Sequence, residues 1–270
     1  VVMLSTLTTK GADVTLDALD IGAVDFIAKP SLEDIVANQD IFKYNLVNKI
    51  KAAAQVEKRN YLHKVTSNNA PSKVVEASNL KTRQIIAIGA STGGTEAIKS
   101  VLTRLPVNTP PIVITQHIPE GFSARFANRL NQACVINICE AKEGQKLEVG
   151  CAYVAPGDKH LKILKSGAGF KCTLDDGEPV NRHKPSVDVL FKSIAKLKTK
   201  HVQAVLLTGM GQDGAEGMLA LQSQGARTIA QDRASSLVWG MPGSAVALGA
   251  TDHEISLNDI AAALVKGAEK

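Results

Sequence analysis

The fold class is decided by residues 85–105, IIAIGASTGGTEAIKSVLTRL. The first five residues, 85–89, are a short apolar run that is typical of a buried strand. The turn ASTGG follows, and residues 94–105 then carry apolar side chains at helical spacing. A buried strand that runs through a glycine turn into a helix is the repeating unit of a parallel sheet covered by helices.

The alternation of strands and helices continues to the C-terminus. It predicts further strands over 112–116, 202–207 and 227–230, several short strands within 134–175, and helices over 122–132, 186–198, 214–223 and 257–267. We therefore expect an α/β fold: a doubly wound, mostly parallel sheet with helices on both faces. Ligands of such sheets bind beyond the carboxyl ends of the strands, which directs attention to the loops 89–94, 115–119 and 208–214.

A smaller block precedes this region. Apolar periodicity predicts strands over 1–5 and 24–28 and helices over 12–21 and 41–57. From about residue 58 to 83 the chain is polar, without a sustained period, and is typical of a linker. We expect an N-terminal unit over 1–52, a helix end and linker over 53–83, and the larger domain over 84–270.

Composition excludes several classes of protein. The chain is 44% hydrophobic and 21% charged, an ordinary globular composition. No apolar run approaches the roughly 20 residues that span a bilayer, and residues 1–5 do not resemble a signal peptide. The four cysteines form no C-x-x-C pair, which argues against zinc and favours reduced thiols in the cytoplasm. A net charge of +5 with one Trp, three Tyr and six Phe offers little for binding nucleic acid.

The turn around Ser91 has three interpretations. It forms a tight connection, cradles a phosphate, or presents Ser91 as a nucleophile beside backbone N–H groups. A dinucleotide site requires G-x-G-x-x-G and an acidic residue about 20 positions later. Here the glycines are spaced G-x-x-x-G-G, and the next strand ends in Thr-Gln-His at 115–117. Thr95 also stands where a P-loop has its Lys, so the phosphate interpretation is disfavoured.

Two further residues fall at the same predicted edge of the sheet. His117 ends the strand 112–116, and Asp213 lies in the loop after the strand 202–207. Each has an ordinary explanation, since a lone His is usually a surface residue and Asp is a good helix N-cap. Together with Ser91, however, they supply a hydroxyl, a base that takes its proton and a carboxylate that orients the base.

Five segments of the larger domain follow one another in a specific order: IIAIGASTGGTEAI, VITQHIPEGFSARFANRL, AYVAPGDKHL, RHKPSVDVLF and LLTGMGQDGAEGM. They resemble the successive signatures of the bacterial chemotaxis protein-glutamate methylesterases, which are also protein-glutamine glutaminases. The resemblance implies that Ser91 is the nucleophile, His117 the base and Asp213 the orienting carboxylate. It also implies the backbone N–H of Met210 as an oxyanion donor and Thr92 as a residue lining the site.

The N-terminal block resembles the last part of a two-component receiver domain, a flavodoxin-like fold. VVMLSTLT matches the fourth receiver strand, with Ser5 at the switch hydroxyl, and VDFIAKPS matches the fifth, with Lys29 at the phosphate-sensing lysine. The first three strands and the phosphoacceptor have no counterpart, so the chain looks N-terminally truncated. Because such a core is incomplete, we expect residues 1–52 to be loosely packed, and slow amide exchange throughout 1–30 would contradict this.

The resemblance implies a cytoplasmic hydrolase that removes methyl esters from glutamate side chains of methyl-accepting chemotaxis receptors, releases methanol, and deamidates receptor glutamines. It implies the chemotaxis histidine kinase as phosphodonor to the full-length parent, and no cofactor, metal, nucleic acid or membrane insertion. Two alternatives remain open: a non-catalytic response-regulator output that only binds receptors or a kinase, and a nicotinamide-dependent dehydrogenase.

Overall fold

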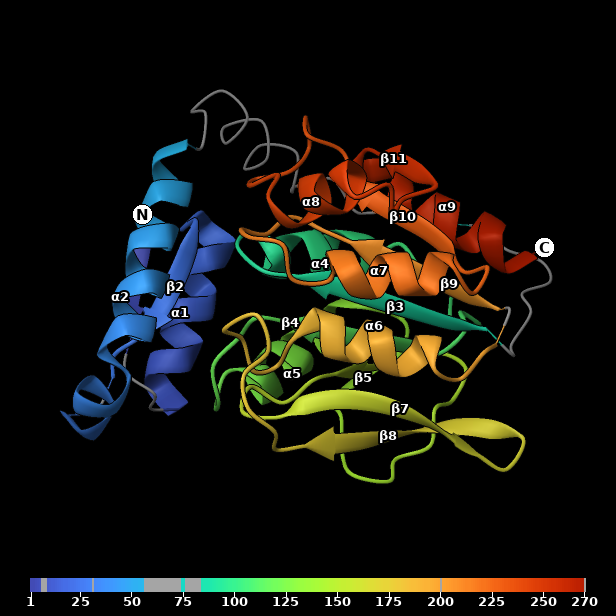
Figure 1. Cartoon of the computed structure of the whole chain (residues 1–270), viewed down its shortest axis with the longest axis horizontal. Helices are drawn as coiled ribbons and strands as arrows, with labels where there is room; N and C mark the ends of the chain where they lie inside the picture. The colour runs from blue at the N-terminus through green and yellow to red at the C-terminus, as the bar shows by residue number, and fades with distance from the viewer. Residues whose placement is uncertain (6–8, 31, 56–73, 76–83, 200, 270) are drawn as a thin grey trace.

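The computed structural model describes residues 1–5, 9–30, 32–55, 74–75, 84–199 and 201–269 (Figure 1). Most of the predicted linker lies outside these ranges. The larger domain is built on a seven-stranded sheet in the order β11-β10-β9-β3-β4-β6-β5. Its strands, in sheet order, are β11 (His253–Ile255), β10 (Arg227–Gln231), β9 (Val202–Leu206), β3 (Ile85–Ala90), β4 (Ile112–Gln116), β6 (Cys151–Val154) and β5 (Asn137–Glu140).

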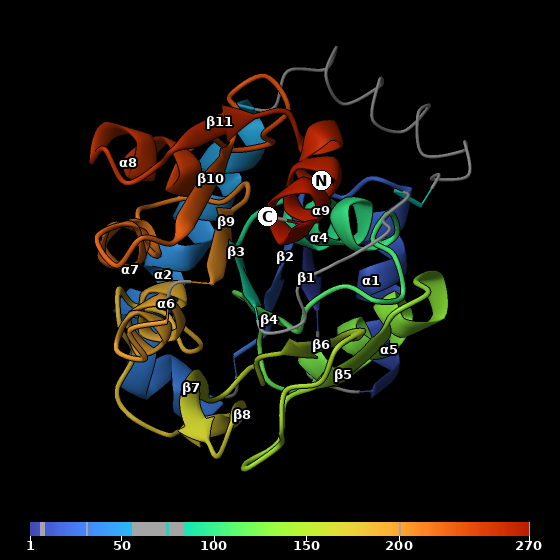
Figure 2. The same ribbon diagram turned by 90° about the vertical axis from the view of Figure 1, so that its right-hand side faces the viewer.

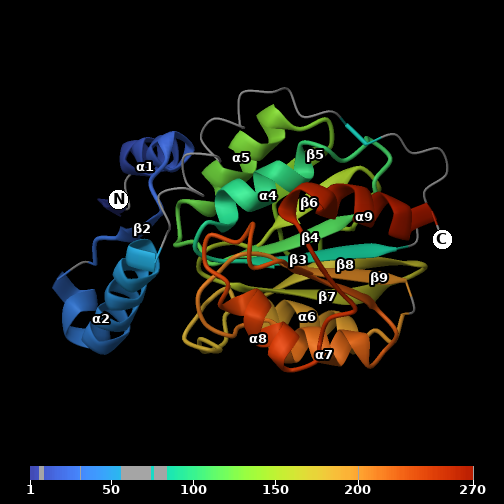
Figure 3. The same cartoon turned by 90° about the horizontal axis from the view of Figure 1, so that it is seen from above.

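Every neighbouring pair in this sheet is parallel. Helices cover both of its faces, as the view in Figure 3 shows. One face carries α4 (Gly94–Leu102), α5 (Ser123–Ala133) and α9 (Leu257–Glu269), and the other carries α6 (Val187–Ala195), α7 (Ala215–Gln222) and α8 (Met241–Ala247). The predicted doubly wound α/β fold is confirmed.

The central strands are apolar because both of their faces are buried. All six residues of β3 are buried, and so are all residues of β4 and β9 on either side of it. Alternate side chains enter the two cores, with Ile86 and Ile88 on the α4 side and Ile85 and Ala87 on the α6 side. A continuous apolar run is therefore the pattern expected for a strand at this position.

The chain reverses its direction of winding between β3 and β9. After β3 it passes through α4 to β4, whereas after β9 it passes through α7 to β10 on the other side (Figure 2). The loops after these two neighbouring strands therefore separate at the carboxyl edge of the sheet and leave a crevice between them. Ser91 follows β3 and Asp213 lies in the loop that follows β9, so the topology brings both to this crevice.

Two parts of the larger domain differ from a simple alternation. Strands β7 (His160–Ser166) and β8 (Gly169–Asp175) form an antiparallel hairpin apart from the main sheet, and its buried side chains join the core under α6. The short elements α8 and β11 were not predicted. The sequence of α8, MPGSAVA, contains Pro and Gly and spans only seven residues, and β11 is a three-residue strand whose His and Glu are exposed.

The N-terminal block consists of the parallel pair β1 (Val2–Ser5) and β2 (Asp25–Ala28) with α1 (Thr9–Ile21) and α2 (Leu32–Gln55). The second helix begins earlier than the predicted start at residue 41. The block lies at one end of the molecule, beside the carboxyl edge of the main sheet (Figures 1 and 3). Its assignment to a receiver domain and the domain boundaries stay predictions.

The inner face of this block is packed, not loose. Leu16 and Phe26 are each 3% exposed and belong to the same apolar core as residues of α4 and α5. The Phe26 ring stacks on that of Phe122, at 4.7 Å between centroids. The expectation of loose packing is therefore wrong for this face, because α4 and α5 of the larger domain pack against it. The rate of amide exchange over 1–30 stays a prediction.

Ion pairs reinforce the contact between the two parts. The carboxylates of α1 face the basic side chains of α4 and α5, in the pairs Asp13–Arg125, Asp17–Arg129, Asp20–Arg129 and Asp20–Lys99. These side chains are partly exposed, so each pair contributes little by itself. Asp13, Asp17 and Asp20 thus serve as contacts to the larger domain.

Candidate active site

The backbone of Ser91 is held between the ends of three neighbouring strands. Its N–H donates to the carbonyl of Thr208, which follows β9, at 3.0 Å. Its carbonyl accepts from the Gln116 side-chain amide at 2.9 Å and from the N–H of Gly94 at 2.7 Å. These contacts fix the direction of the Ser91 side chain, which is 9% exposed at the carboxyl edge of the sheet.

The glycines beside Ser91 make room for protein side chains. Gly93 has φ of 75°, in the left-handed region, and a Cβ there would lie 2.7 Å from a methyl group of Leu237. A Cβ on Gly94 would lie 2.2 Å from Oε1 of Gln116. Leu237 and Gln116 thus pack closely against these two glycines, so a larger residue at either position would not fit.

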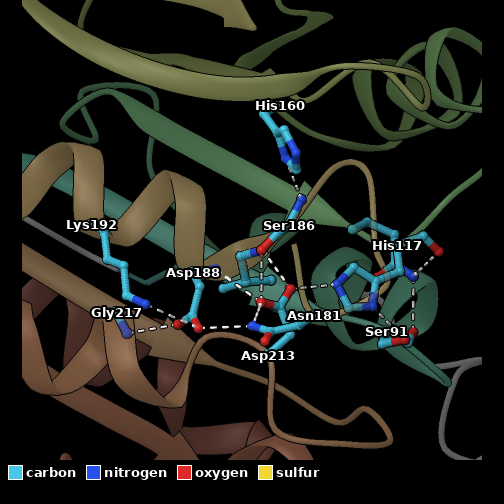
Figure 4. A network of polar contacts seen from close by, with 11 residues as sticks. Ser91, His117, His160, Asn181, Ser186, Asp188, Lys192, Asp213 and Gly217 are labelled. Atoms are coloured by element: carbon cyan, nitrogen blue, oxygen red, sulfur yellow. Dashed lines mark hydrogen bonds and ion pairs between the residues drawn. The ribbon is translucent and has the colours of Figure 1, made fainter. Parts of the chain in front are cut away.

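The three residues singled out from the sequence meet at this edge (Figure 4). Nδ1 of His117 lies 3.1 Å from Oγ of Ser91, and Nε2 of His117 lies 2.8 Å from Oδ2 of Asp213. A carboxylate can only accept, so Nε2 carries the ring proton and the lone pair of Nδ1 faces the serine hydroxyl. This is the tautomer that a base needs in order to take the proton of Ser91.

Asp213 is almost fully buried and accepts hydrogen bonds from several donors. Its partners besides His117 are Nδ2 of Asn181 (2.8 Å), Oγ of Ser186 (2.7 Å) and the backbone N–H groups of Val187 (2.7 Å) and Asp188 (3.2 Å). Burial by itself would raise the pKa of Asp213. The hydrogen bonds from His117, Asn181 and Ser186 and the electrostatic interaction with His117 outweigh burial and lower the pKa. The carboxylate therefore stays ionised.

The N-terminus of α6 explains why a buried carboxylate is stable here. Ser186 is the N-cap of that helix, and the free N–H groups of its first turn point at Asp213. His160, 1% exposed, fixes this helix end in turn, since its Nδ1 accepts from the N–H of Ser186 and its Nε2 bonds the carbonyl of Glu178. Figure 4 follows this chain of contacts from His160 to Ser91.

Sequence reasoning missed three residues of the site. Asn181 and Ser186 bind Asp213, and the ring of His183 stacks on that of His117, with 3.7 Å between centroids and 14° between planes. The segment 181–186 reads locally as a polar turn before a helix, and no periodic signal places it beside the triad. The available signal was the resemblance of the segment RHKPSVDVLF, which contains His183 and Ser186, to a family signature.

A cavity of about 600 Å³ opens above Ser91. One side is lined by Ser91, Thr92, Asn181, Arg182, His183, Met210, Gly211, Gln212, Asp213 and Ser244, and the other by Tyr44, Asn45, Asn48 and Lys49 of α2. Met210 and Thr92 thus lie at the site as expected. The hydroxyl of Thr92 donates to Oδ2 of Asp25, whose Oδ1 accepts from Lys49 at 2.8 Å. The N-terminal block therefore contacts the residue next to Ser91.

Ser5 and Lys29, the suggested switch residues, lie together at the ends of β1 and β2. The N–H of Lys29 donates to the carbonyl of Ser5 at 2.6 Å. The hydroxyl of Ser5 donates to the carbonyl of Gly11 and accepts from the hydroxyl of Thr15. Lys29 is exposed. The structure places both at one edge of the small sheet, and their role as switch remnants stays a prediction.

The described residues offer neither a metal site nor a membrane-spanning helix. Within the described ranges, no group of three or more His, Cys, Asp or Glu side chains is arranged to hold a metal ion. No helix in that part of the chain combines the length and the apolar character that a membrane span requires. The four cysteines, which the structure describes, are all free thiols.

Comparisons with known proteins show the family to which this chain belongs. A sequence profile described as CheB methylesterase matches residues 86–264, more than half of the chain. The protein-glutamate methylesterase/protein-glutamine glutaminase 2 of Saccharophagus degradans is 48% identical over 273 residues, covering 100% of this chain and 78% of that protein. The Salmonella typhimurium protein of the same type is 47% identical over 263 residues, covering 96% of this chain and 73% of that protein.

A solved structure gives the same result. The CheB methylesterase catalytic domain of Thermotoga maritima is 33% identical and superposes with a TM-score of 0.67, covering 69% of this chain and 99% of that one. The similarity thus holds in sequence along nearly the whole chain and in three dimensions over 69% of it. This chain is a member of the CheB methylesterase family.

Proposed function

We propose that this protein is a protein-glutamate methylesterase and protein-glutamine glutaminase in which Ser91 is the nucleophile. The observation that carries the proposal is the continuous hydrogen-bond line from Oγ of Ser91 through His117 to the buried carboxylate of Asp213. Family membership supports the reaction, because the relatives from Saccharophagus degradans and Salmonella typhimurium carry both activities in their names.

The first half of the reaction acylates the enzyme. His117 takes the proton of Ser91 on Nδ1 while Oγ attacks the ester carbonyl, and Asp213 stabilises the imidazolium that forms. The tetrahedral intermediate then collapses: the bond from carbon to the methoxy oxygen breaks, and His117 gives its proton to that oxygen. Methanol leaves, and the glutamyl group remains as an ester on Ser91.

The second half regenerates the enzyme. Water gives a proton to His117 and attacks the glutamyl ester, and Ser91 leaves as its oxygen recovers that proton. The product is the free carboxylate of glutamate. With a side-chain amide in place of the ester, the same steps release ammonia and convert glutamine to glutamate.

We assign the oxyanion site to the backbone N–H of Met210, with Thr92 lining the cavity beside it. Met210 follows Gly209, where an added Cβ would lie only 2.8 Å from Cβ of Ser91. The loop after β9 thus approaches the nucleophile closely, and Met210 lines the cavity that Ser91 faces. An N–H donor in this position stabilises charge that develops only in the transition state.

The substrates we propose are the cytoplasmic helices of methyl-accepting chemotaxis receptors, and the enzyme works in the cytoplasm. A longer parent that carries a complete receiver would take its phosphoryl group from the chemotaxis histidine kinase. This chain covers 78% and 73% of the two relatives, so each of those proteins contains further sequence that this chain does not match.

The test is methanol release from methylated receptor by the full chain. Ser91→Ala should lower the rate by roughly three powers of ten or more, since a triad acts as a unit. Ser223→Ala is the matched control, because that hydroxyl lies at the exposed end of α7 and bonds only the carbonyl of Leu219 among its described contacts. Near-normal release by the Ser91 variant would reject the proposal, and binding of receptor without any release by the unaltered chain would favour a non-catalytic output.

A further inference from the structure

A tight turn next to the site carries two of its contacts. Val180 and His183 exchange both backbone hydrogen bonds, at 3.1 and 2.9 Å, which closes a two-residue turn. The residues between them have positive φ, 53° at Asn181 and 66° at Arg182. Positive φ at both central positions defines a type I′ turn, which Asn tolerates and a long side chain such as that of Arg does not favour. An unfavourable backbone of this kind is kept where the surroundings hold it in place.

Two residues of the turn, Asn181 and His183, each contact a member of the triad. The side-chain amide of Asn181 donates one N–H to Asp213 and the other to Asp188, at 2.8 and 2.9 Å (Figure 4). The ring of His183 lies parallel to that of His117, 3.7 Å away between centroids. The turn therefore positions the carboxylate through one residue and covers the face of the base with another.

The His183 ring makes no hydrogen bond to another described residue, so the stack is its principal contact. Burial lowers the pKa of His183 to about 3, and the charges of His117, Lys49 and Arg182 also lower it, whereas Asp213 opposes them. His183 is thus neutral in the range where the enzyme would work. Of the two stacked rings, only that of His117 is hydrogen-bonded to the carboxylate of Asp213 among the described residues, and it is the ring that faces Ser91.

A neutral aromatic face next to His117 has two physical consequences. It restricts rotation of the ring about its side-chain bond, so that Nδ1 keeps facing Ser91 while Nε2 faces Asp213. It also places a π surface against a ring that becomes positive when it takes the serine proton, a favourable cation–π arrangement. The second effect is larger in the transition state than in the resting enzyme, so it accelerates the reaction.

We propose that His183 is a positioning residue for the hydrolysis: its ring, stacked on His117, holds the plane of that ring and stabilises the imidazolium formed when Ser91 loses its proton. The inference rests on the proposed function. His183 lies in the RHKPSVDVLF segment, which contains none of the expected catalytic residues. The competing role for His183 is a hydrogen bond from its ring to the substrate, since it lines the same cavity as Ser91.

Three variants of the full chain separate these roles. His183→Phe keeps an aromatic face without a hydrogen-bonding atom, His183→Leu keeps a comparable apolar volume without the face, and His183→Gln keeps hydrogen bonding alone. We expect the Leu and Gln variants to lose about 5- to 30-fold in kcat for methanol release with KM changed less than about twofold, the range of a desolvated cation–π contact. The Phe variant should retain most of the rate.

The pH profile gives a second readout that packing alone would not move. Without the stack the protonated form of the base is less stable, so the acid limb of kcat/KM should move to lower pH by about 0.5–1 unit in the Leu variant and not in the Phe variant. Equal activity of the Phe and Leu variants would overturn the proposal. Activity retained by Gln but lost in Phe would also overturn it, in favour of a contact with substrate.

An NMR titration of His117 tests the proposal without catalytic turnover. In a Ser91→Ala chain, the ring nitrogens of His117 can be titrated by NMR with His183 intact and with His183→Phe or His183→Leu. A drop in the apparent His117 titration midpoint for Leu alone supports the proposal, and identical titration in all three chains overturns it. If Leu does not fold, as judged by thermal unfolding, the comparison of Phe with Gln decides. Failure of the unaltered chain to release methanol would reject the proposed function but leave this titration to judge the stack.

Discussion

The substitution Asp213→Asn tests how the buried carboxylate works. Oδ2 of Asp213 accepts from two donors and Oδ1 from three: Nε2 of His117 and the N–H of Val187 at Oδ2, and the Asn181 amide, the Ser186 hydroxyl and the N–H of Asp188 at Oδ1. An asparagine has one accepting oxygen and one donating amide. In either orientation its NH₂ group therefore faces at least two N–H or O–H donors.

Two magnitudes follow from this geometry. If the NH₂ group faces His117, Nε2 can no longer keep its proton, the ring proton moves to Nδ1, and Ser91 then faces a donor instead of a base. We expect kcat to fall by about 10³- to 10⁴-fold, which corresponds to roughly 4–5.5 kcal/mol in the barrier. The opposed donors should also lower the free energy of unfolding by about 2–4 kcal/mol.

Methanol release under saturating receptor and denaturant unfolding measure the two quantities in the same chains. The matched control is Asp188→Asn, because Asp188 is a buried carboxylate that binds the Asn181 amide and the N–H of Gly217 but does not touch His117. The control should lose comparable stability and less than about tenfold in kcat. An Asp213→Asn chain that stays within tenfold of the unaltered kcat, or a control that loses as much rate, would refute the reasoning.

Two other perturbations probe packing and charge. Gly209→Ala adds a methyl group that meets Sδ of Met241 and lies 2.8 Å from Cβ of Ser91. We therefore expect kcat to fall by about 10- to 100-fold and the free energy of unfolding by about 1–3 kcal/mol. Gly169→Ala, where an added Cβ has open surroundings, should leave both quantities nearly unchanged, and equal effects of the two substitutions would contradict the close packing at Gly209. Burial and a hydrogen bond with Asp20 raise the pKa of Glu96 from 4.5 to about 7. Between these two pH values the folded chain keeps a proton on Glu96 that the unfolded chain has released. The stability contributed by Glu96 is therefore complete below pH 4.5 and is lost as pH rises through about 7. The change in the free energy of unfolding is on the order of 2 kcal/mol. Glu96→Gln should flatten this dependence in unfolding measured from pH 5 to 8, and an unchanged slope would argue against a protonated Glu96.

The core of the fold could be predicted because its signals are local. The six buried residues of β3 form an uninterrupted apolar run, and the glycine turn and helix that follow indicate a parallel α/β unit. The rule that ligands bind at the carboxyl edge then predicts, from the sequence alone, that Ser91, His117 and Asp213 lie together. For these residues, position in the topology was sufficient.

The rest depends on contacts between distant segments. His183 and Asn181 reach the triad only because a type I′ turn, followed by the start of α6, lies beside the loop after β9. The packing of α1 depends on α4 and α5, which are far away in the sequence, so the N-terminal segment considered alone led to an expectation of loose packing. No periodicity within a segment reports such contacts.

The most direct test of the central claim is covalent labelling of the chain with a serine-directed organophosphonate, followed by peptide mass spectrometry. We expect a single modified site at Ser91, with labelling slowed by several powers of ten in His117→Ala and unchanged in the control His253→Ala, whose ring is exposed on β11. Labelling of Ser91 that proceeds equally fast without the imidazole of His117, or modification at other serines only, would contradict it.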